Sequence, residues 1–265
     1  MNSIVTEKDI LRMESKVAIV TGGADGIGKE LARKYLSNQY EVAIFDVSEK
    51  ALQSTAQEFQ RLGNFLPLLT NVADEASVTD SVAQVIRRFS HIDILVNNAG
   101  GSMAVSQEVE RIAAADWDKV INVNLRGAFL CAKAVIPAMK ERKSGRIVNM
   151  ASVAGRGRSF FGGTPYAAAK AGVIGFTRQA SRELGKFGIT INAVAPGVVI
   201  SGARISDYWH NKKTEEERNA LLSLTPLGRM GVPADIVEVV YFLTSDGGAY
   251  ITGAVIDVNG GQWVG

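Results

Sequence analysis

Hydrophobic residues in this chain gather in short runs that alternate with longer stretches of helical periodicity. A short apolar run bounded by polar residues is typical of a strand buried on both faces, as strands of a parallel sheet are. Seven such runs are visible, at residues 17–21, 41–46, 65–69, 92–97, 146–150, 189–195 and 254–258. Strands that alternate with helices predict repeated βαβ units, and therefore an α/β protein built around a parallel sheet.

The stretches between these runs carry the periodicity of amphipathic helices. In the clearest case the apolar residues fall on one helix face: Val78, Val82, Val85, Ile86 and Phe89. Asp74 stands before them and is a good N-cap, because its carboxylate can accept a hydrogen bond from a free main-chain N–H of the first turn. We therefore expect a helix that begins directly after Asp74.

Length and composition favour a single large domain. The chain has 265 residues, and 46% of them are hydrophobic, which is enough for a continuous core. No linker or repeat interrupts it, so we expect one domain over residues 16–265, preceded by a poorly ordered arm over 1–15. Residues 200–226 form a long segment without strand character. This segment is either a substrate lid or a helical hairpin used in subunit packing.

Charge and cysteine content narrow the possible partners. The net charge is +2, with 29 basic and 27 acidic residues spread along the chain, so we expect neither nucleic acid nor a membrane as partner, but a small molecule. The single cysteine, Cys131, has no internal partner for a disulfide and lies among apolar residues typical of a packed helix. The charged N-terminus does not resemble a signal peptide, and we expect a cytoplasmic protein.

A glycine-rich turn follows the first predicted strand. Gly22, Gly26 and Gly28 lie between this strand and a helix that begins near Ile27. Glycines at such positions let the backbone turn tightly and approach a pyrophosphate, which the helix N-terminus can bind. Together with the alternating elements, the turn predicts a doubly wound Rossmann fold, with a seven-stranded parallel sheet and helices on both faces.

Asp46 ends the second predicted strand, about 20 residues after the glycine turn. A carboxylate at this place can accept hydrogen bonds from both hydroxyls of an adenine ribose, and it would repel a 2′-phosphate. Neither Asp25 nor Val47 supplies a compensating positive charge. The expected cofactor is therefore NAD rather than NADP.

A candidate proton-transfer pair lies further along the chain. Tyr166 and Lys170 are four residues apart on a predicted helix, so their side chains share a face. A neighbouring ammonium favours the phenolate and lowers the pKa of a tyrosine, which then can exchange a proton with an alcohol or ketone oxygen. Neither histidine of the chain has the context of a serine hydrolase, and no metal-ligand cluster is visible.

With its motifs in this order, the chain closely resembles the short-chain dehydrogenase/reductase family, in its shorter, non-extended oxidoreductase form. The resemblance covers residues 16–261. The motifs that carry it are the glycine turn, Asn97-Asn98-Ala99-Gly100, Asn124, Ser152, Tyr166-x-x-x-Lys170 and Pro196-Gly197.

The resemblance implies a role for each of these residues. Tyr166 would be the acid/base, and Lys170 would lower its pKa and bind the nicotinamide ribose. Ser152 would hold the substrate oxygen, and Asn124 would fix a water that relays the proton. The residues implied to bind the cofactor are Gly22, Asp25, Gly26, Ile27, Gly28, Asp46, Asn71, Val72, Asn98, Ala99, Gly100, Tyr166, Lys170, Pro196, Gly197, Val199 and Ser201. A homotetramer is also implied.

The substrate is less well defined by the sequence. Its candidate contacts are Ser152, Arg156, Arg158, Arg204 and Trp209. The planar fork of arginine suits a carboxylate, phosphate or sulfonate, which would indicate an anionic substrate. The alternative is that these arginines are solvated or take part in subunit contacts. Sugars and polyols, hydroxy acids, steroids and aryl alcohols all stay open.

The leading hypothesis is an NAD-dependent enzyme that interconverts a secondary alcohol and a ketone. An NADPH-dependent 3-oxoacyl-carrier-protein reductase is the first alternative, and Asp46 counts against it. The second is a catalytically silent nucleotide-sensing protein that kept the fold and lost the chemistry. Such a protein need not retain Ser152, Tyr166 and Lys170 together, so their joint presence favours an enzyme.

Overall fold

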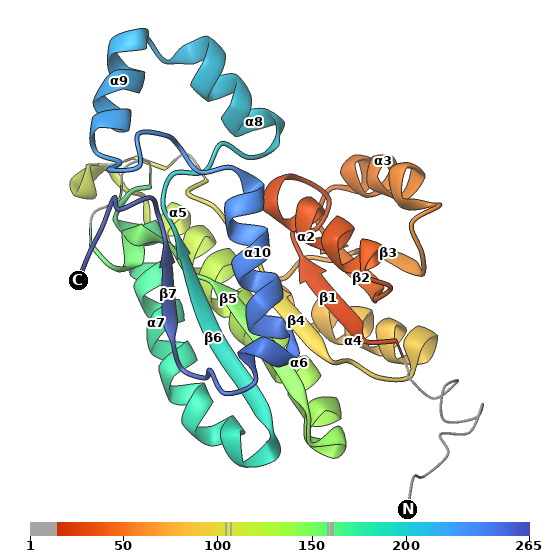
Figure 1. Ribbon diagram of the computed structural model, residues 1–265. Coiled ribbons are helices and arrows are strands. Elements are labelled where there is room, and N and C mark those ends of the chain that lie inside the picture. Colours follow the sequence, from red (N-terminus) through yellow and green to blue (C-terminus); the bar gives the residue numbers. More distant parts are fainter. Residues whose placement is uncertain (1–14, 104, 107, 158, 160–161) are drawn as a thin grey trace, which may run out of the picture.

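The computed structural model describes residues 15–103, 105–106, 108–157, 159 and 162–265. Within these residues, seven parallel strands form one sheet in the order β3-β2-β1-β4-β5-β6-β7, with helices on both faces (Figure 1). The predicted α/β fold, its seven-stranded parallel sheet and its single domain are confirmed. The expected arm over 1–15 lies outside the described residues, apart from its last residue.

All seven predicted strands are present in the described chain. They are β1 (Val17–Thr21), β2 (Glu41–Asp46), β3 (Phe65–Leu69), β4 (Ile94–Asn97), β5 (Gly145–Met150), β6 (Ile189–Pro196) and β7 (Val255–Val258). The prediction placed the start of β4 at residue 92, whereas the strand begins at Ile94. Asp93 stands at this edge: its N donates to Val17 O at 3.0 Å, its O accepts from Arg146 N at 2.8 Å, and its Oδ2 accepts from Val17 N at 2.8 Å.

The helices fill the intervals between the strands. They are α2 (Gly26–Ser37), α3 (Glu49–Phe59), α4 (Glu75–Phe89), α5 (Ala114–Ile121), α6 (Gly127–Arg142), α7 (Thr164–Leu184), α8 (Gly202–Asp207), α9 (Glu215–Ser223) and α10 (Pro233–Thr244), with a π-helical turn η2 (Asn122–Arg126) between α5 and α6, a second π-helical turn η5 (Tyr208–Lys212) after α8, and 3-10 turns η1 (Val109–Arg111), η3 (Val153–Gly155), η4 (Gly185–Phe187) and η6 (Asp246–Gly248). Asp74 caps α4 as predicted, with Oδ1 accepting from Ala76 N at 2.9 Å.

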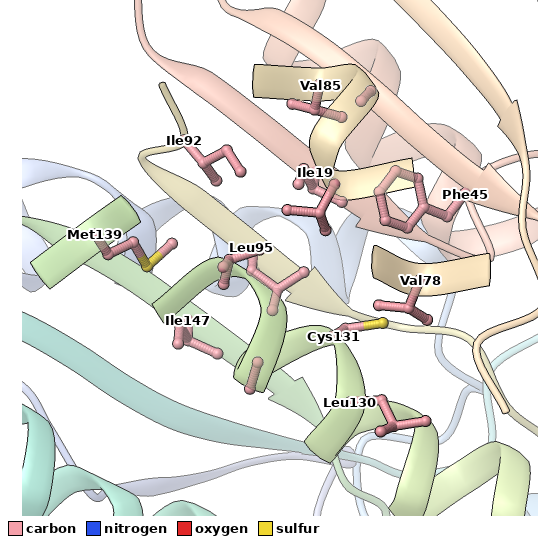
Figure 2. Packing of buried hydrophobic residues seen from close by; sticks show 14 of the residues in the cluster. Ile19, Phe45, Val78, Val85, Ile92, Leu95, Leu130, Cys131, Met139 and Ile147 are labelled. Atoms are coloured by element: carbon pink, nitrogen blue, oxygen red, sulfur yellow. The ribbon is translucent and has the colours of Figure 1, made fainter. Parts of the chain in front are cut away.

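Each face of the sheet has its own hydrophobic core. On one face the strands pack against α4, α6 and α7, and on the other against α2, α3 and α10. Figure 2 shows the first of these cores, in which Cys131 of α6 lies among aliphatic side chains. Burial raises the pKa of this thiol to about 12, so it is a packing residue, as predicted, rather than a reactive thiolate.

The helical stretch Ala114–Arg142, which runs through α5, η2 and α6, is the one candidate among the described residues whose length and apolar composition would suit a membrane span. In the structure Leu130, Val135 and Met139 of this stretch are buried against the sheet. Packing in the core therefore accounts for its apolar character.

Strand β1 has β2 on one side and β4 on the other. The chain leaves β2 through α3 on one face of the sheet, and it leaves β4 through α6 on the opposite face. At such a switch point the carboxyl ends of the strands leave a crevice. The expected lid segment, residues 200–226, folds into α8, η5 and α9 over this end of the sheet (Figure 1).

Candidate active site

The glycine turn after β1 is tied to the loop after β4. Thr21 Oγ1 accepts hydrogen bonds from Asn98 N and Ala99 N, both at 3.0 Å, and Asn98 Nδ2 donates to Gly22 O at 3.1 Å. A side chain at Gly28 would overlap both Gly22 O and the Asn98 amide. These contacts explain why small residues stand here, because the two loops approach each other too closely for a Cβ.

Helix α2 begins at the mouth of the same crevice. Asp25 is its N-cap, with Oδ1 accepting from Gly26 N at 2.8 Å, and Gly26 takes the positive φ of 54° that the turn needs. Asp25, Gly26 and Ile27 all line the crevice. The positive end of the helix dipole and its N–H groups therefore face a space where a pyrophosphate could lie.

Asp46 lies beside the glycine turn. Its Oδ2 accepts from Ala24 N at 3.1 Å and its Oδ1 from Ser48 N at 3.0 Å. The side chain of Val47 next to it is 73% exposed. A carboxylate is thus held by two main-chain N–H groups at the end of β2, next to the exposed Val47.

Asn124 is buried in the π-helical turn η2 and holds the loop that follows Asn98. Its Oδ1 accepts from Gly101 N at 2.9 Å, and its Nδ2 donates to Gly101 O at 3.0 Å and to Val120 O at 2.9 Å. A side chain at Gly100 would overlap Asn124 Oδ1. Both amide hydrogens are engaged, so the structure assigns this side chain a positioning contact, and the predicted water-relay role stays a prediction.

Ser152, Tyr166 and Lys170 line one wall of the crevice. Ser152 follows β5, and its Oγ accepts from Ala154 N at 3.1 Å, which leaves the hydroxyl hydrogen available to donate. Tyr166 and Lys170 lie one turn apart on α7, and Lys170 Nζ donates to Met150 O at 2.7 Å. The helix therefore brings the phenol and the ammonium, which share one face as predicted, to the carboxyl end of β5.

Burial controls the protonation of both groups. Loss of water lowers the pKa of Lys170 to about 8. Burial raises the pKa of Tyr166, and a hydrogen bond from Ser152 opposes this effect. The sequence predicted that Lys170 lowers the pKa of Tyr166. The structure shows the opposite direction, because desolvation of the phenol dominates, and the Lys170 ammonium is 5.6 Å from the phenol ring centre and bonded to Met150 O.

The crevice has a volume of about 660 Å³, within the range of small-molecule sites. Most residues implied to bind the cofactor or to act in catalysis line it: Gly22, Asp25, Gly26, Ile27, Asn98, Ala99, Gly100, Ser152, Tyr166, Lys170, Pro196, Gly197, Val199 and Ser201. The volume of the crevice, the close approach allowed by the glycines and the first turn of α2 at its mouth fit a dinucleotide. No group of three potential metal ligands occurs among the described residues.

Four implied cofactor residues lie outside this lining: Gly28, Asp46, Asn71 and Val72. Asn71 uses its Oδ1 to accept from Ala73 N at 3.1 Å within its own turn, and Val72 is buried against Gly127. The structure therefore gives both a local packing role at the end of β3 and does not bring their side chains to the crevice.

The substrate candidates divide in the same way. Trp209 lines the crevice, whereas Arg156 pairs with Asp257 Oδ2 at 2.9 Å and stacks over Trp263 at 4.2 Å. Arg156 therefore does not support the expected anionic substrate, because its guanidinium is already paired with the Asp257 carboxylate of β7. Arg158 lies outside the described residues, and Arg204 is described only through its place in α8.

Sequence reasoning missed several residues of the lining. Ser102, Ser159 and Gly162 contribute to it, and an added Cβ at Gly162 would come within 2.5 Å of the Tyr166 ring. The glycine pair just before Tyr166 was the available signal, since glycine marks close backbone approach.

Comparison with known proteins agrees with this geometry. The short chain dehydrogenase family model matches residues 16–210. The chain belongs to the short-chain dehydrogenase/reductase family. The protein is therefore an oxidoreductase of a family whose members bind a nicotinamide cofactor and act on small-molecule substrates.

Among curated relatives, the chain is 41% identical over 251 residues to "(2S)-[(R)-hydroxy(phenyl)methyl]succinyl-CoA dehydrogenase subunit BbsD" of Thauera aromatica, covering 94% of this chain and 97% of that protein. It is 40% identical over 253 residues to the 3-oxoacyl-(acyl-carrier-protein) reductase FabG of Thermotoga maritima, covering 95% and 99%. The crystal structure of levodione reductase superposes with a TM-score of 0.87 at 34% identity, covering 95% and 98% of the two chains.

Proposed function

We propose that this protein is an NAD-dependent dehydrogenase that interconverts a secondary alcohol and a ketone. The observation that supports it best is a single crevice lined both by the glycine turn and by Ser152, Tyr166 and Lys170. One site can thus hold a dinucleotide and a proton-transfer group together.

Each catalytic side chain has a defined task in this proposal. The nicotinamide cofactor, when bound, gives or takes the hydride. The Tyr166 phenol donates a proton to the substrate oxygen in reduction and takes one in oxidation. The Ser152 hydroxyl donates a hydrogen bond to the same oxygen and stabilises negative charge on it. The Lys170 ammonium supplies positive charge that favours the phenolate once the site is filled.

Asp46 supports NAD as the cofactor, because its carboxylate would repel a 2′-phosphate. The 40% identity to a 3-oxoacyl-carrier-protein reductase supports the alternative, a reductase that uses NADPH. A cofactor titration separates the two. We expect kcat/KM with NAD to exceed that with NADP by at least about tenfold, and preferred oxidation of NADPH would reject our choice.

The test of the reaction is a panel of secondary alcohols with NAD, read by NADH absorbance, with acidic and neutral members paired. The matched control is Tyr166→Phe, which keeps the ring and removes the acid. Turnover by the unaltered protein that this variant loses would support the proposal. NADH binding without turnover of any alcohol or ketone, unchanged in Tyr166→Phe, would instead identify a nucleotide sensor.

Three further features belong to the proposal. Residues 200–226 act as a substrate lid, since Ile205, Tyr208 and Trp209 of this segment line the crevice. The active form is a homotetramer, which a light-scattering mass equal to one chain would reject. The protein works in the cytoplasm, which fractionation of the source cells would test.

A further inference from the structure

The side chain of Gln262 connects the two ends of the lid segment. Its Oε1 accepts a hydrogen bond from Val198 N at 2.9 Å, and its Nε2 donates to Thr225 Oγ1 at 2.8 Å. Val198 stands before α8, and Thr225 follows α9. One amide group therefore binds the chain where it enters the lid and where it leaves.

The position of Gln262 is itself well determined. Asn259 holds the turn before it, with Oδ1 accepting from Gly261 N at 2.8 Å and Nδ2 donating to Trp263 O at 3.0 Å. At Gly197 an added Cβ would overlap Gln262 Oε1, so the absence of a side chain there is what lets the amide reach Val198.

The partners of Gln262 have limited freedom. Thr225 is only 3% exposed. The main-chain oxygen of Val198 accepts a hydrogen bond from Gly231 N at 2.9 Å, which fixes the backbone at this residue. Leu227 N donates to Gly260 O at 3.1 Å close by. A rigid base of this kind sets where the intervening residues lie, because loop positions follow from how the loop ends are fixed.

The residues between the two fixed ends include Ile205, Tyr208 and Trp209, which line the crevice, whereas Gln262 does not. We propose that Gln262 is a positioning residue: by holding the base of the lid through Val198 and Thr225, it sets the place of Tyr208 and Trp209 and thereby the affinity for substrate. The kinetic part of this inference rests on the proposed dehydrogenase function.

The test replaces Gln262 with methionine, which has a similar length and neither polar atom. Hydrogen exchange is followed in the purified protein with no substrate or cofactor added, and kcat and KM are measured separately with the best alcohol. Loss of two neutral hydrogen bonds corresponds to about tenfold, so we expect about tenfold faster exchange confined to residues 200–225 and about tenfold higher KM. The dissociation constant of NADH and kcat should stay within about twofold.

Two further variants make the result specific. Gln57→Met places the same substitution on an exposed residue of α3 and should match the unaltered protein. Thr225→Val removes the bond to Gln262 from the lid side, together with the bond from Thr225 Oγ1 to Leu221 O at 3.3 Å. Combined with Gln262→Met it should add only the effect of losing the Leu221 bond. If Gln262→Met does not fold, Thr225→Val carries both readouts, with a smaller change.

Unchanged exchange in residues 200–225 would overturn the proposal. So would faster exchange throughout the protein, or a fall in kcat and NADH affinity as large as the rise in KM, since either result marks a general structural role. Exchange is measured without turnover. Failure of the unaltered protein to oxidise any alcohol would therefore reject the proposed function and leave the positioning contact to be decided by exchange.

Discussion

Lys170 Nζ donates a hydrogen bond to the main-chain oxygen of Met150 at 2.7 Å. The ammonium on α7 is thereby anchored to the end of β5, at the wall of the crevice that also holds Tyr166. Lys170 is 4% exposed, and a hydrogen bond to one main-chain oxygen replaces only part of its lost hydration. Its lowered pKa of about 8 expresses that cost.

We expect the cost of burying Lys170 to disappear as pH rises. The pKa of this group is about 8 in the folded protein and 10.5 ordinarily, so between these values the unfolded chain binds more protons. The free energy of unfolding therefore increases with pH in this window. Relative to Lys170→Met, the cofactor-free protein should gain up to about 3 kcal/mol between pH 8 and 10.5. Urea unfolding at steps of pH measures this difference, and a constant difference would contradict the assignment.

Tyr166→Phe should remove the proton transfer and leave the cofactor site intact. General acid–base catalysis contributes about 10²- to 10⁴-fold, so kcat should fall by that factor. The dissociation constant of NADH, measured by fluorescence, should change by less than about threefold, because the ring keeps its place on α7. A variant that loses NADH binding and activity together would indicate that the phenol holds the cofactor instead.

The parts of the site that could be predicted follow from the order of elements and from local chemistry. The strand before the glycine turn and the helix after it identified that turn, and the period of a helix gave the shared face of Tyr166 and Lys170. Arg156 could not be placed in this way, since its partner Asp257 is 101 residues further on. Gln262 likewise acts through Val198 and Thr225, and no local pattern marks such a long-range contact.

Asp46→Asn should weaken the discrimination between NAD and NADP. The amide oxygen can keep one of the two main-chain bonds, to Ala24 or Ser48, while the negative charge is lost. We expect the ratio of kcat/KM for NADP to that for NAD to rise by at least about tenfold, since the repulsion of a 2′-phosphate disappears. The change should appear mainly in the KM for the cofactor. An unaltered ratio would show that another residue selects the cofactor.

Arg156→Ala should reduce stability without altering the choice between acidic and neutral substrates. The guanidinium pairs with Asp257 and stacks on Trp263, and its side chain is 15% exposed, so its loss leaves a partly buried carboxylate unpaired. We expect about 1–3 kcal/mol of destabilisation, measured by urea unfolding. Asp257→Asn in the same background should add little. A selective loss of activity toward acidic alcohols would show instead that Arg156 binds an anion.

Gly100→Ala and Gly101→Ala form a matched pair that tests the contact with Asn124. Both glycines have nearly the same φ, 154° and 155°, which L side chains rarely adopt, so alanine is strained at either position. Their surroundings differ. A Cβ at Gly100 would overlap Asn124 Oδ1, whereas at Gly101 nothing lies within 4 Å.

Because alanine at position 100 must displace Asn124, the loop that lines the crevice should shift with it. We expect Gly100→Ala to be less stable than Gly101→Ala by about 1–3 kcal/mol. It should also bind NADH at least about tenfold more weakly than Gly101→Ala does. Thermal unfolding and NADH fluorescence titration measure the two effects. Equal behaviour of the pair would mean that backbone strain alone explains both glycines and that Asn124 does not set the shape of the cofactor site.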